Sequence, residues 1–272
     1  MLANKACFVC SEKNRLELIS IITHKPQLET DFGIKEDQYY REISLCKNCG
    51  TYNNFHNYDF KKLYEGVYND RTYNKNICSN YDKIMNLPYE KSDNKQRVER
   101  IVNFSKSKGY DLKNTNVLDV GSGLCVFLAE FMKHGIKGFC IDPDPISIQH
   151  ARNNVKVTEA FLGSFEDYNS DYSFDVITLN KVLEHIINPI FWLKKAKKYI
   201  KKGGFIYIEL PDGKNALNNG KLTNREEFYI EHLTIFSIES IEYIANQLGF
   251  KIETMESIHE PSNKYTIFVF LR

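Results

Sequence analysis

Two glycines follow a short apolar run in the segment Val117-Leu118-Asp119-Val120-Gly121-Ser122-Gly123. A strand that turns through such glycines into a helix presents free backbone N–H groups and the positive end of the helix dipole to an anion. Glycines also let a ligand approach the backbone without a Cβ in the way. Asp142 ends the next expected strand, where its carboxylate can accept hydrogen bonds from both ribose hydroxyls of an adenosine. The pattern predicts a site for an adenosine-containing cofactor.

The spacing of the glycines bears on which cofactor binds. NAD-binding turns usually carry a third glycine, which lets a pyrophosphate and the helix fit closely, and Val126 occupies that position here. S-adenosylmethionine has an adenosine but no pyrophosphate, and its carboxylate can meet the helix start. The turn therefore favours S-adenosylmethionine over a nicotinamide cofactor. The alternative is a glycine turn that joins strand to helix and binds no ligand.

Four cysteines form two pairs with two-residue spacing, Cys7 with Cys10 and Cys46 with Cys49. Four thiolates suit tetrahedral Zn²⁺, and this spacing lets both sulfurs of a pair face one ion. We expect a structural zinc, with a small sheet filling the long gap between the pairs. Free thiols and a disulfide or redox pair remain open. Cys78, Cys125 and Cys140 are single and are expected to be packing residues.

Two histidines are placed where a substrate would bind. Glu184-His185 follows one expected strand, and Tyr229-Ile230-Glu231-His232 follows the next. Open α/β sheets bind ligands beyond the carboxyl ends of their strands. A substrate that must lose a proton to become nucleophilic needs a base. His185 and His232 are the candidates for such proton transfer, and the alternative for each is a structural histidine.

Alternating helical and strand-like segments must position these residues. Apolar strands separated by helices predict a parallel sheet covered on both faces. The last two strands have no helix between them and should pair as a hairpin. The expected helices are 97–108, 125–134, 146–153, 189–200 and 238–248, and the expected strands are 117–120, 138–141, 155–161, 174–179, 205–210, 251–258 and 265–271.

Residues 115–272 resemble a class I S-adenosylmethionine-dependent methyltransferase in VLDVGSG (117–123), GFCIDPDP (138–145), LGSFEDY (162–168), FDVITLNKVLEHIINP (174–189) and KKGGFIYIELPD (201–212). The resemblance implies an α/β, Rossmann-like, seven-stranded methyltransferase sheet with a terminal antiparallel hairpin, preceded by a small zinc-binding domain. It also implies the cofactor contacts. The methionine part would lie beside Asp119, Gly121 and Gly123, the ribose at Asp142, the adenine near Phe165 and Glu166, and the sulfonium near Asn180.

The paired cysteines and the Tyr-x-Glu-His pattern are similar to those of sugar C-methyltransferases, and related enzymes occur in surface-polysaccharide clusters. This resemblance implies that His232 is the base, that Glu231 orients it, that Tyr229 hydrogen-bonds the substrate and that His185 touches a substrate oxygen. It also makes residues 63–68 an aromatic lid, with Tyr68 as the first expected contact and Tyr64 as the second. The alternative for these tyrosines, which are four residues apart, is a helical packing stripe.

The acceptor class stays open at this point. The sugar enzymes carry a further C-terminal domain, whereas this sequence ends at Arg272, just after the expected hairpin. O-methylation of a sugar or of a phosphorylated precursor is therefore a rival to C-methylation. An RNA or protein methyltransferase, an oxidoreductase and a catalytically silent binding module are the other classes.

Composition narrows the choice among these functional classes. The 272 residues carry a formal net charge of +1, so no global field attracts nucleic acid. The lysines of 194–202 alternate with apolar residues, as on the solvated face of an amphipathic helix. The sequence has neither a spanning apolar run nor a signal-peptide pattern at its start, and its cysteine usage suits a reducing cytoplasm. We expect a zinc-binding and substrate-lid domain at 1–92 and a methyltransferase domain at 93–272, with the polar run 90–95 as a linker and no prediction of oligomeric state.

Overall fold

The apolar segments after Asn116 form one seven-stranded sheet in the computed structural model, which describes residues 5–58 and 77–272. The strand order is β10-β11-β8-β7-β4-β5-β6. The inner strands run parallel, whereas β11 pairs antiparallel with both β8 and β10. The predicted mostly parallel sheet with a terminal hairpin is confirmed. Its strands are β4 (Asn116–Val120), β5 (Lys137–Asp142), β6 (Glu159–Leu162), β7 (Phe174–Asn180), β8 (Ile200–Pro211), β10 (Ile252–His259) and β11 (Tyr265–Leu271).

Successive strands are added to the sheet in one direction from β4 and then in the opposite direction from β7, so the order of addition reverses at the centre of the sheet. From β4 the chain moves outward through β5 and β6, then returns to place β7 on the other side of β4. The register puts Asp119 of β4 opposite Thr178 of β7. Loops leaving two such strands diverge at their carboxyl ends and open a crevice, which is where α/β sheets bind ligands. The loop containing Gly121 follows β4, and Lys181 follows β7.

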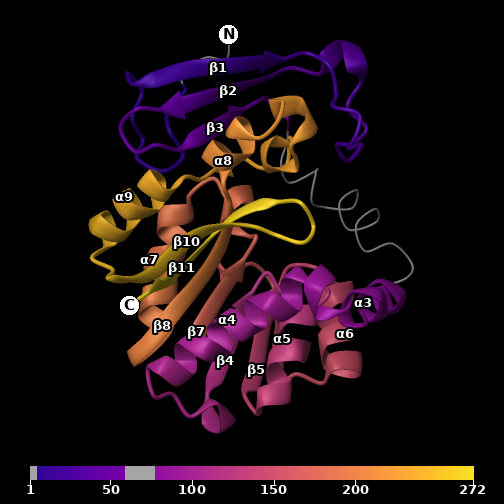
Figure 1. Cartoon of the computed structure of the whole chain (residues 1–272), viewed down its shortest axis with the longest axis vertical. Helices are drawn as coiled ribbons and strands as arrows, with labels where there is room; N and C mark the ends of the chain where they lie inside the picture. Colours follow the sequence, from indigo (N-terminus) through magenta and orange to yellow (C-terminus); the bar gives the residue numbers. More distant parts are fainter. Residues whose placement is uncertain (1–4, 59–76) are drawn as a thin grey trace.

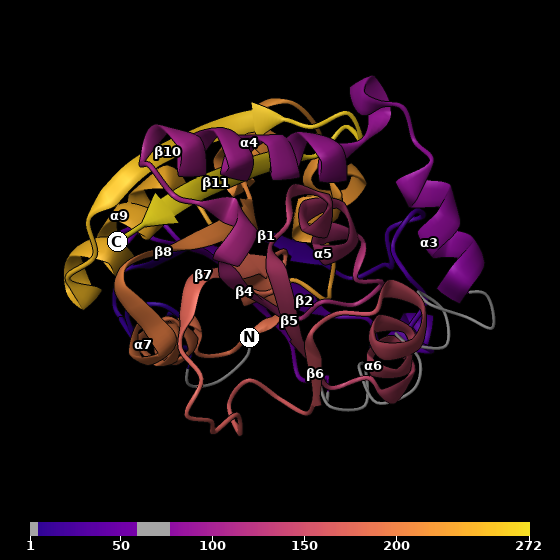
Figure 2. The ribbon, with the colours of Figure 1, turned by 90° about the horizontal axis from the view of Figure 1, so that it is seen from below.

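Helices cover both faces of this sheet, and two separate apolar clusters result (Figure 2). One face packs against α4, α5 and α6 through residues such as Ile101, Leu128 and Ile148. The other packs against α7 and α9 through residues such as Leu193 and Ile244. The five helices are α4 (Asp93–Ser107), α5 (Val126–Phe131), α6 (Pro145–His150), α7 (Pro189–Tyr199) and α9 (Ile238–Leu248), and α3 (Ile77–Met85) lies beside α5 and α6.

Two local differences from the sequence expectations have simple causes. Helix α4 begins at Asp93, inside the expected linker, because the Ser92 side chain accepts a hydrogen bond from the Lys95 backbone N–H as an N-cap. The expected strand at 155–161 starts at Glu159, because Ala151–Val155 continues the preceding helix as a π turn.

A second sheet lies above the first and has the order β1-β2-β3-β9 (Figure 1). Its strands are β1 (Leu16–Ile22), β2 (Arg41–Cys46), β3 (Tyr52–Phe55) and β9 (Thr234–Ile235), so its last strand comes from the other end of the chain. A shared apolar cluster that includes Ile43, Phe228 and Ile235 fills the space between this sheet and α8 (Gly213–Asn218). The small sheet expected near the cysteines is thus present, and Thr234 and Ile235 form its last strand.

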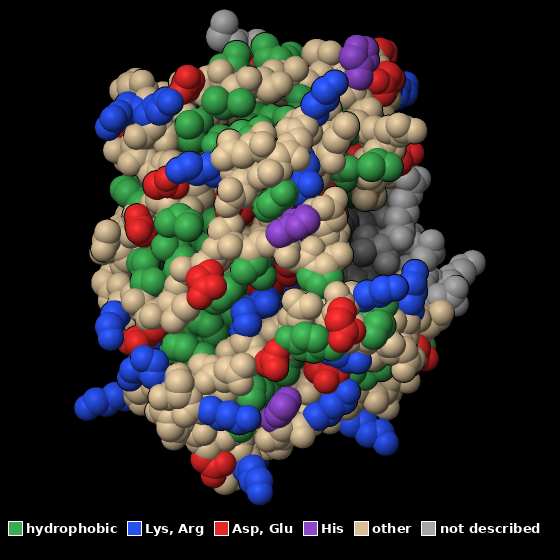
Figure 3. Space-filling view, in the orientation of Figure 1, with side chains coloured by type: hydrophobic (Ala, Val, Ile, Leu, Met, Phe, Trp, Pro, Cys, Tyr) green, Lys and Arg blue, Asp and Glu red, His purple; other side chains and the backbone are tan. Residues whose placement is uncertain are grey.

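The charged side chains at the surface agree with the formal net charge of +1 of the sequence. Basic and acidic side chains of the described residues are interspersed over the face in Figure 3. The expected basic stripe lies on α7, where Leu193 and Ala196 are buried while Lys194 and Lys198 are exposed. Within residues 5–58 and 77–272, no helix has the length and apolar character needed to cross a bilayer.

Candidate functional site

The glycine turn after β4 requires glycine and is tied to the end of β5. Gly121 has a φ of +71°, and a Cβ there would lie 2.7 Å from Cγ2 of Val182. The Gly123 backbone N–H donates to Oδ2 of Asp142 at 2.8 Å, and Oδ1 of Asp142 accepts from the Asp144 N–H at 2.9 Å. The two features that the sequence singled out therefore contact each other. Burial raises the pKa of Asp142 to about 6.

Asp119 joins the ends of β4 and β7 at the crevice. Its Oδ1 accepts hydrogen bonds from the Thr178 hydroxyl at 2.6 Å and from the Asn180 side-chain amide at 3.0 Å. The side chain of Asp119 is buried, and this burial raises its pKa to about 7. These bonds fix Asn180 beside the turn, as expected for a residue that follows this strand.

One cavity of about 410 Å³ unites most of the predicted site. The glycine turn and the two predicted histidines both line it. Of the predicted residues, it is lined by Asp119, Gly121, Gly123, Asn180, His185, Glu231 and His232. Segments far apart in the sequence are thus brought to a single space at the carboxyl ends of β4 and β7.

His185 and His232 both line this cavity and lie side by side, with ring centroids 4.9 Å apart. Nδ1 of His185 lies 2.9 Å from the Glu231 carbonyl oxygen, and Nδ1 of His232 lies 3.1 Å from the Glu227 carbonyl oxygen. A carbonyl only accepts, so both Nδ1 atoms carry the proton and the lone pairs are on Nε2. Burial lowers the pKa of His185 to about 4, and burial together with His185 lowers the pKa of His232 well below its usual value. Both rings are neutral near pH 7.

Carboxylates accompany the two histidines. Glu184 is 1% exposed, and burial raises its pKa to about 7. Glu231 is buried as well, and burial raises its pKa to about 7. Glu184 comes from the turn Leu183–His185 after β7, whereas Glu231 comes from the segment before β9. The cavity thus combines neutral imidazoles with carboxyl groups that hold or release protons near neutral pH.

The N-terminal sheet holds the segment that carries His232. Asn54 of β3 donates from Nδ2 to the carbonyl oxygens of Tyr229 and His232, both at 3.1 Å. Arg41 of β2 donates to the Phe228 carbonyl oxygen and, at 3.1 Å, to Oε2 of Glu29. That Glu29 oxygen also accepts from the Ile230 N–H at 2.7 Å. The sequence analysis missed these three polar residues, because nothing local in the sequence marks their partners.

Charged residues that line or support the cavity were also missed. Arg97 lines the cavity and donates from Nε to Oε2 of Glu209 at 2.6 Å, and Arg100 binds the other oxygen of Glu209 at 2.6 Å. Burial would raise the pKa of Glu209, but the two guanidinium charges outweigh it and hold the pKa at about 2. The only sequence signal was a lone acidic residue inside an otherwise apolar strand.

Other predicted residues lie away from the described cavity. Tyr229 is buried and does not line it. Phe165 packs in the core against Trp192, and Glu166 accepts a hydrogen bond from Nε1 of Trp192 at 3.0 Å. Asp142 does not line the cavity, but its carboxylate accepts a hydrogen bond from the N–H of Gly123, which does line it. Tyr64 and Tyr68 lie outside the described residues. The substrate and adenine contacts expected of these side chains stay predictions.

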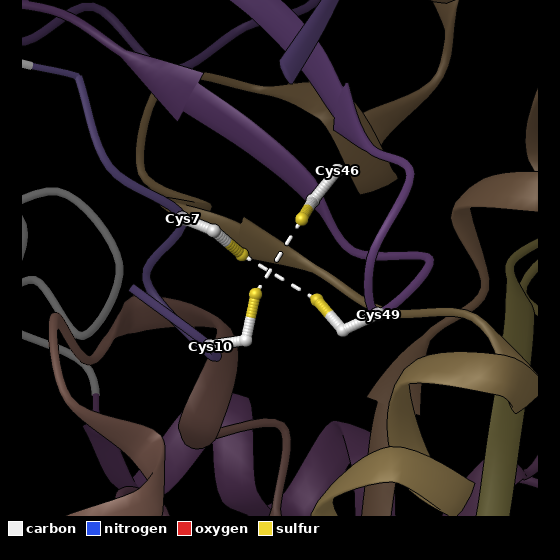
Figure 4. Close-up of side chains that lie close together, drawn as sticks. All are labelled: Cys7, Cys10, Cys46 and Cys49. Carbon is white, nitrogen blue, oxygen red and sulfur yellow. Dashed lines mark hydrogen bonds between the residues drawn. The ribbon is translucent and has the colours of Figure 1, made fainter. Parts of the chain in front are cut away.

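The four cysteines converge between the N-terminal sheet and α9 (Figure 4). Sγ of Cys7 lies 3.5 Å from Sγ of Cys49, and Sγ of Cys10 lies 3.5 Å from Sγ of Cys46. These separations are far longer than the roughly 2.05 Å of a disulfide and near the ~3.8 Å edge of a tetrahedral zinc–thiolate centre. The hydrogen bond from Cys49 lowers the pKa of Cys7 to about 5. The donor set fits Zn²⁺.

Comparisons with known proteins agree with this geometry. The family model described as "Methyltransferase domain" matches residues 85–255. A ubiquinone biosynthesis O-methyltransferase from Pelagibacter ubique is 26% identical over 170 residues, which are 60% of this chain and 64% of that protein. This chain thus spans less than two thirds of the length of that relative.

Solved structures share the fold at low identity. Magnesium protoporphyrin IX methyltransferase from Synechocystis PCC 6803, with bound SAH, has a TM-score of 0.55 and 12% identity, covering 74% of this chain and 97% of that one. An S-adenosylmethionine-dependent methyltransferase from Clostridium acetobutylicum has a TM-score of 0.54 and 13% identity, covering 74% of this chain and 99% of that one.

Proposed function

Because this chain belongs to the methyltransferase domain family and is an S-adenosylmethionine-dependent methyltransferase, we propose that it methylates a small carbohydrate-type acceptor, such as a nucleotide sugar or a surface-polysaccharide precursor. One observation carries the proposal. The glycine turn beside Asp119 and the pair His185 and His232 line the same cavity of about 410 Å³. A cofactor held at one end and an acceptor held at the other would meet inside it.

The cofactor end consists of the turn and its supports. S-adenosylmethionine supplies a methyl group that its sulfonium already activates, so the protein mainly has to position the acceptor. Gly121 and Gly123 leave the backbone open to the methionine part, and Asp142 keeps the turn in place through the Gly123 N–H. Asn180 is fixed by Asp119 at the wall that would face the sulfonium. Phe165 and Glu166 remain the proposed neighbours of the adenine.

The acceptor end is built around the two imidazoles. In the absence of a bound cation, Nε2 of His232 is the proton acceptor, and His185 contacts the acceptor oxygen. The acceptor atom forms a bond to the methyl carbon, the carbon–sulfur bond breaks with its electron pair left on sulfur, and the acceptor proton goes to His232. Glu231 and Tyr229 belong to the same segment and would orient the base and the substrate.

O-methylation of a phosphorylated metabolite or of a glycan is the second candidate. The relatives that share 24–26% identity with this chain are named as O-methyltransferases. A neutral histidine can accept a proton from a hydroxyl, as O-methylation requires. It can equally accept one from a carbon next to a ketone, as C-methylation requires. An RNA or protein acceptor is the third candidate, and the formal net charge of +1 argues against RNA only.

We also propose that residues 1–92 form a zinc-binding unit and residues 93–272 the methyltransferase domain. Four converging thiols with one lowered pKa support Zn²⁺ at Cys7, Cys10, Cys46 and Cys49. With four protein ligands this ion is structural, because no coordination position stays open for chemistry. Its role would be to hold the sheet that carries Asn54 and Arg41 against the histidine segment.

The test uses S-adenosylmethionine with an isotopically labelled methyl group. We would incubate it with the protein and a small-molecule extract of the source cell, then search for labelled products by mass spectrometry. A labelled sugar nucleotide is expected, and its fragmentation separates C- from O-methylation. Label only in RNA or protein, in parallel incubations with macromolecules, would overturn the small-molecule proposal.

A second test changes the proposed cofactor site and includes a matched control variant. Asp142→Asn replaces a carboxylate that holds the glycine turn, so we expect at least a tenfold weaker affinity for S-adenosylmethionine and a folded protein. Asp171→Asn changes an exposed aspartate and should bind as the wild type does. Equal affinity for all three proteins would refute a role of Asp142 in cofactor binding.

A further inference from the structure

The acceptor end of the cavity also has the composition of a metal site. We infer that Glu184, His185 and His232 together bind one divalent transition-metal ion. One ligand atom from each of these side chains lies within 4.8 Å of the other two. All three side chains line the cavity. Two imidazoles and one carboxylate form a donor set for Zn²⁺, Mn²⁺, Fe²⁺ or Co²⁺, with coordination positions left open.

The orientation of both imidazoles matches that of metal ligands. A histidine that binds a metal through one nitrogen usually donates its other ring N–H to a carbonyl or carboxylate, which fixes the tautomer. His185 and His232 both do so, through Nδ1 to the carbonyl oxygens of Glu231 and Glu227. Each ring therefore directs the lone pair of Nε2 away from its backbone partner. Two rings whose centroids are 4.9 Å apart need only small rotations to share an ion.

Glu184 supplies an independent observation. Its side chain is 1% exposed and lines the cavity, yet Oε2 makes no hydrogen bond with any described residue. A buried carboxylate oxygen without a partner is costly and requires an explanation. A cation beside the two imidazoles would satisfy it. The turn Leu183–His185 places Glu184 and His185 next to each other, and the β9 segment brings His232 to them.

The site would select the acceptor. Three protein ligands leave positions for two oxygens of one substrate, so the fitting acceptors carry adjacent oxygens, as in a vicinal diol or a hydroxy-ketone. This part rests on the proposed function. With the ion bound, His232 is a ligand and no longer the proton acceptor. The ion lowers the pKa of the bound hydroxyl, whose proton passes to water while its oxygen forms the bond to the methyl carbon.

Mn²⁺ provides a probe that separates this site from the cysteines. Thiolates favour Zn²⁺, whereas a carboxylate–imidazole set accepts Mn²⁺. The full-length protein, with its zinc content verified, would be titrated with Mn²⁺ and the free ion followed by electron paramagnetic resonance. We expect one Mn²⁺ per chain. Glu184→Gln and His232→Ala should each weaken its binding at least tenfold, whereas His134→Ala, at an exposed histidine, should not change it.

Two outcomes overturn the inference. One is the absence of stoichiometric Mn²⁺ binding, and the other is the same affinity in all four proteins. Circular dichroism and S-adenosylmethionine affinity, which should match the wild type in Glu184→Gln, show that this variant is folded.

The methyl-transfer assay keeps the two proposals apart. If the protein freed of the second ion transfers the labelled methyl group at the wild-type rate, the role of the ion in binding and activating the acceptor fails and the proposed function stands. If Mn²⁺ binds and no small molecule accepts the label, the proposed function fails and the metal site stands.

Discussion

Asn54 donates from its side-chain amide to the backbone carbonyl of His232 at 3.1 Å, although 178 residues separate them. The same amide reaches the Tyr229 carbonyl. Asn54 is fully buried in β3, so these bonds are shielded from water. A polar residue of the N-terminal sheet thus sets the position of the segment that we propose to contact the acceptor.

We predict that Asn54→Asp displaces the segment that carries His232 while the protein stays folded. The second carboxylate oxygen would face two carbonyl oxygens, so we expect a loss of about 1–3 kcal/mol in the free energy of unfolding. The methyl-transfer rate should fall at least tenfold, with an unchanged affinity for S-adenosylmethionine. Chemical denaturation and labelled-methyl assays measure both effects. Asn218→Asp, at an exposed position of α8, is the control, and equal rates in the two variants would contradict the positioning role.

The buried pair of Arg41 and Glu29 yields a second prediction. Both side chains are 0% exposed, and their charged atoms lie 3.1 Å apart. Arg41→Met leaves the carboxylate of Glu29 buried without its cation, so the free energy of unfolding should fall by about 3–5 kcal/mol. Arg41→Met combined with Glu29→Leu should cost less than the sum of the two single variants.

Urea unfolding of the four proteins of this cycle measures the coupling. Arg15→Met, at an exposed arginine, should behave as the wild type does. Strict additivity of the single variants would show that the pair does not act as a unit.

Loss of one cysteine should release the proposed zinc. Cys46→Ser removes one of four converging thiols, so we expect the zinc content to fall from about one ion per chain to near zero. The N-terminal sheet should then lose its protection from hydrogen exchange, and β9 with it. Elemental analysis and exchange mass spectrometry check both. Cys78→Ser, at an exposed thiol, should keep the metal, and a wild-type protein without zinc would end the proposal.

Asp119 should make stability depend on pH in a defined direction. Its pKa in the native state is about 7, whereas its ordinary value is 3.8. Between these values the native state binds more protons than the unfolded state, so the contribution of Asp119 to stability falls as pH rises from about 4 to about 7. Asp119→Asn keeps the accepting oxygen and removes the titration. The stability of the wild type relative to this variant should decrease by a few kcal/mol over that window and then level off.

Urea unfolding of the cofactor-free proteins at several pH values measures this difference. Parallel stability curves for the wild type and the variant would contradict the raised pKa.

Local patterns in the sequence were enough to predict the glycine turn at which we propose that the cofactor binds. Gly121 and Gly123 follow one strand and Asp142 ends the next, and the turn that they predict is present, with the Asp142 carboxylate hydrogen-bonded to the Gly123 N–H. The alternation of elements likewise predicted the parallel sheet and the hairpin, because the central strands β4, β5 and β7 are largely apolar runs. These features depend on neighbours in the chain and on a periodicity that the sequence displays.

The support of the acceptor end could not be predicted in this way. Arg41 contacts Phe228 across 187 residues, and no periodicity indicates that pairing. The two-residue strand β9 is too short to stand out in the sequence, and it forms only because β3 offers an edge to it. The start of β6 was misplaced for a related reason, since a π turn at 151–155 has no simple composition signal.

The contribution of β9 to the N-terminal sheet restricts how this protein can be recombined with its relatives. Residues 226–237 belong to the second half of the chain, yet their hydrogen-bond partners include Glu29, Arg41 and Asn54 of the N-terminal segment. A chimera with its only crossover near residue 92 would separate these partners from one another. A crossover design that transplants 5–58 together with 226–237 would move the complete acceptor-side support as one cassette.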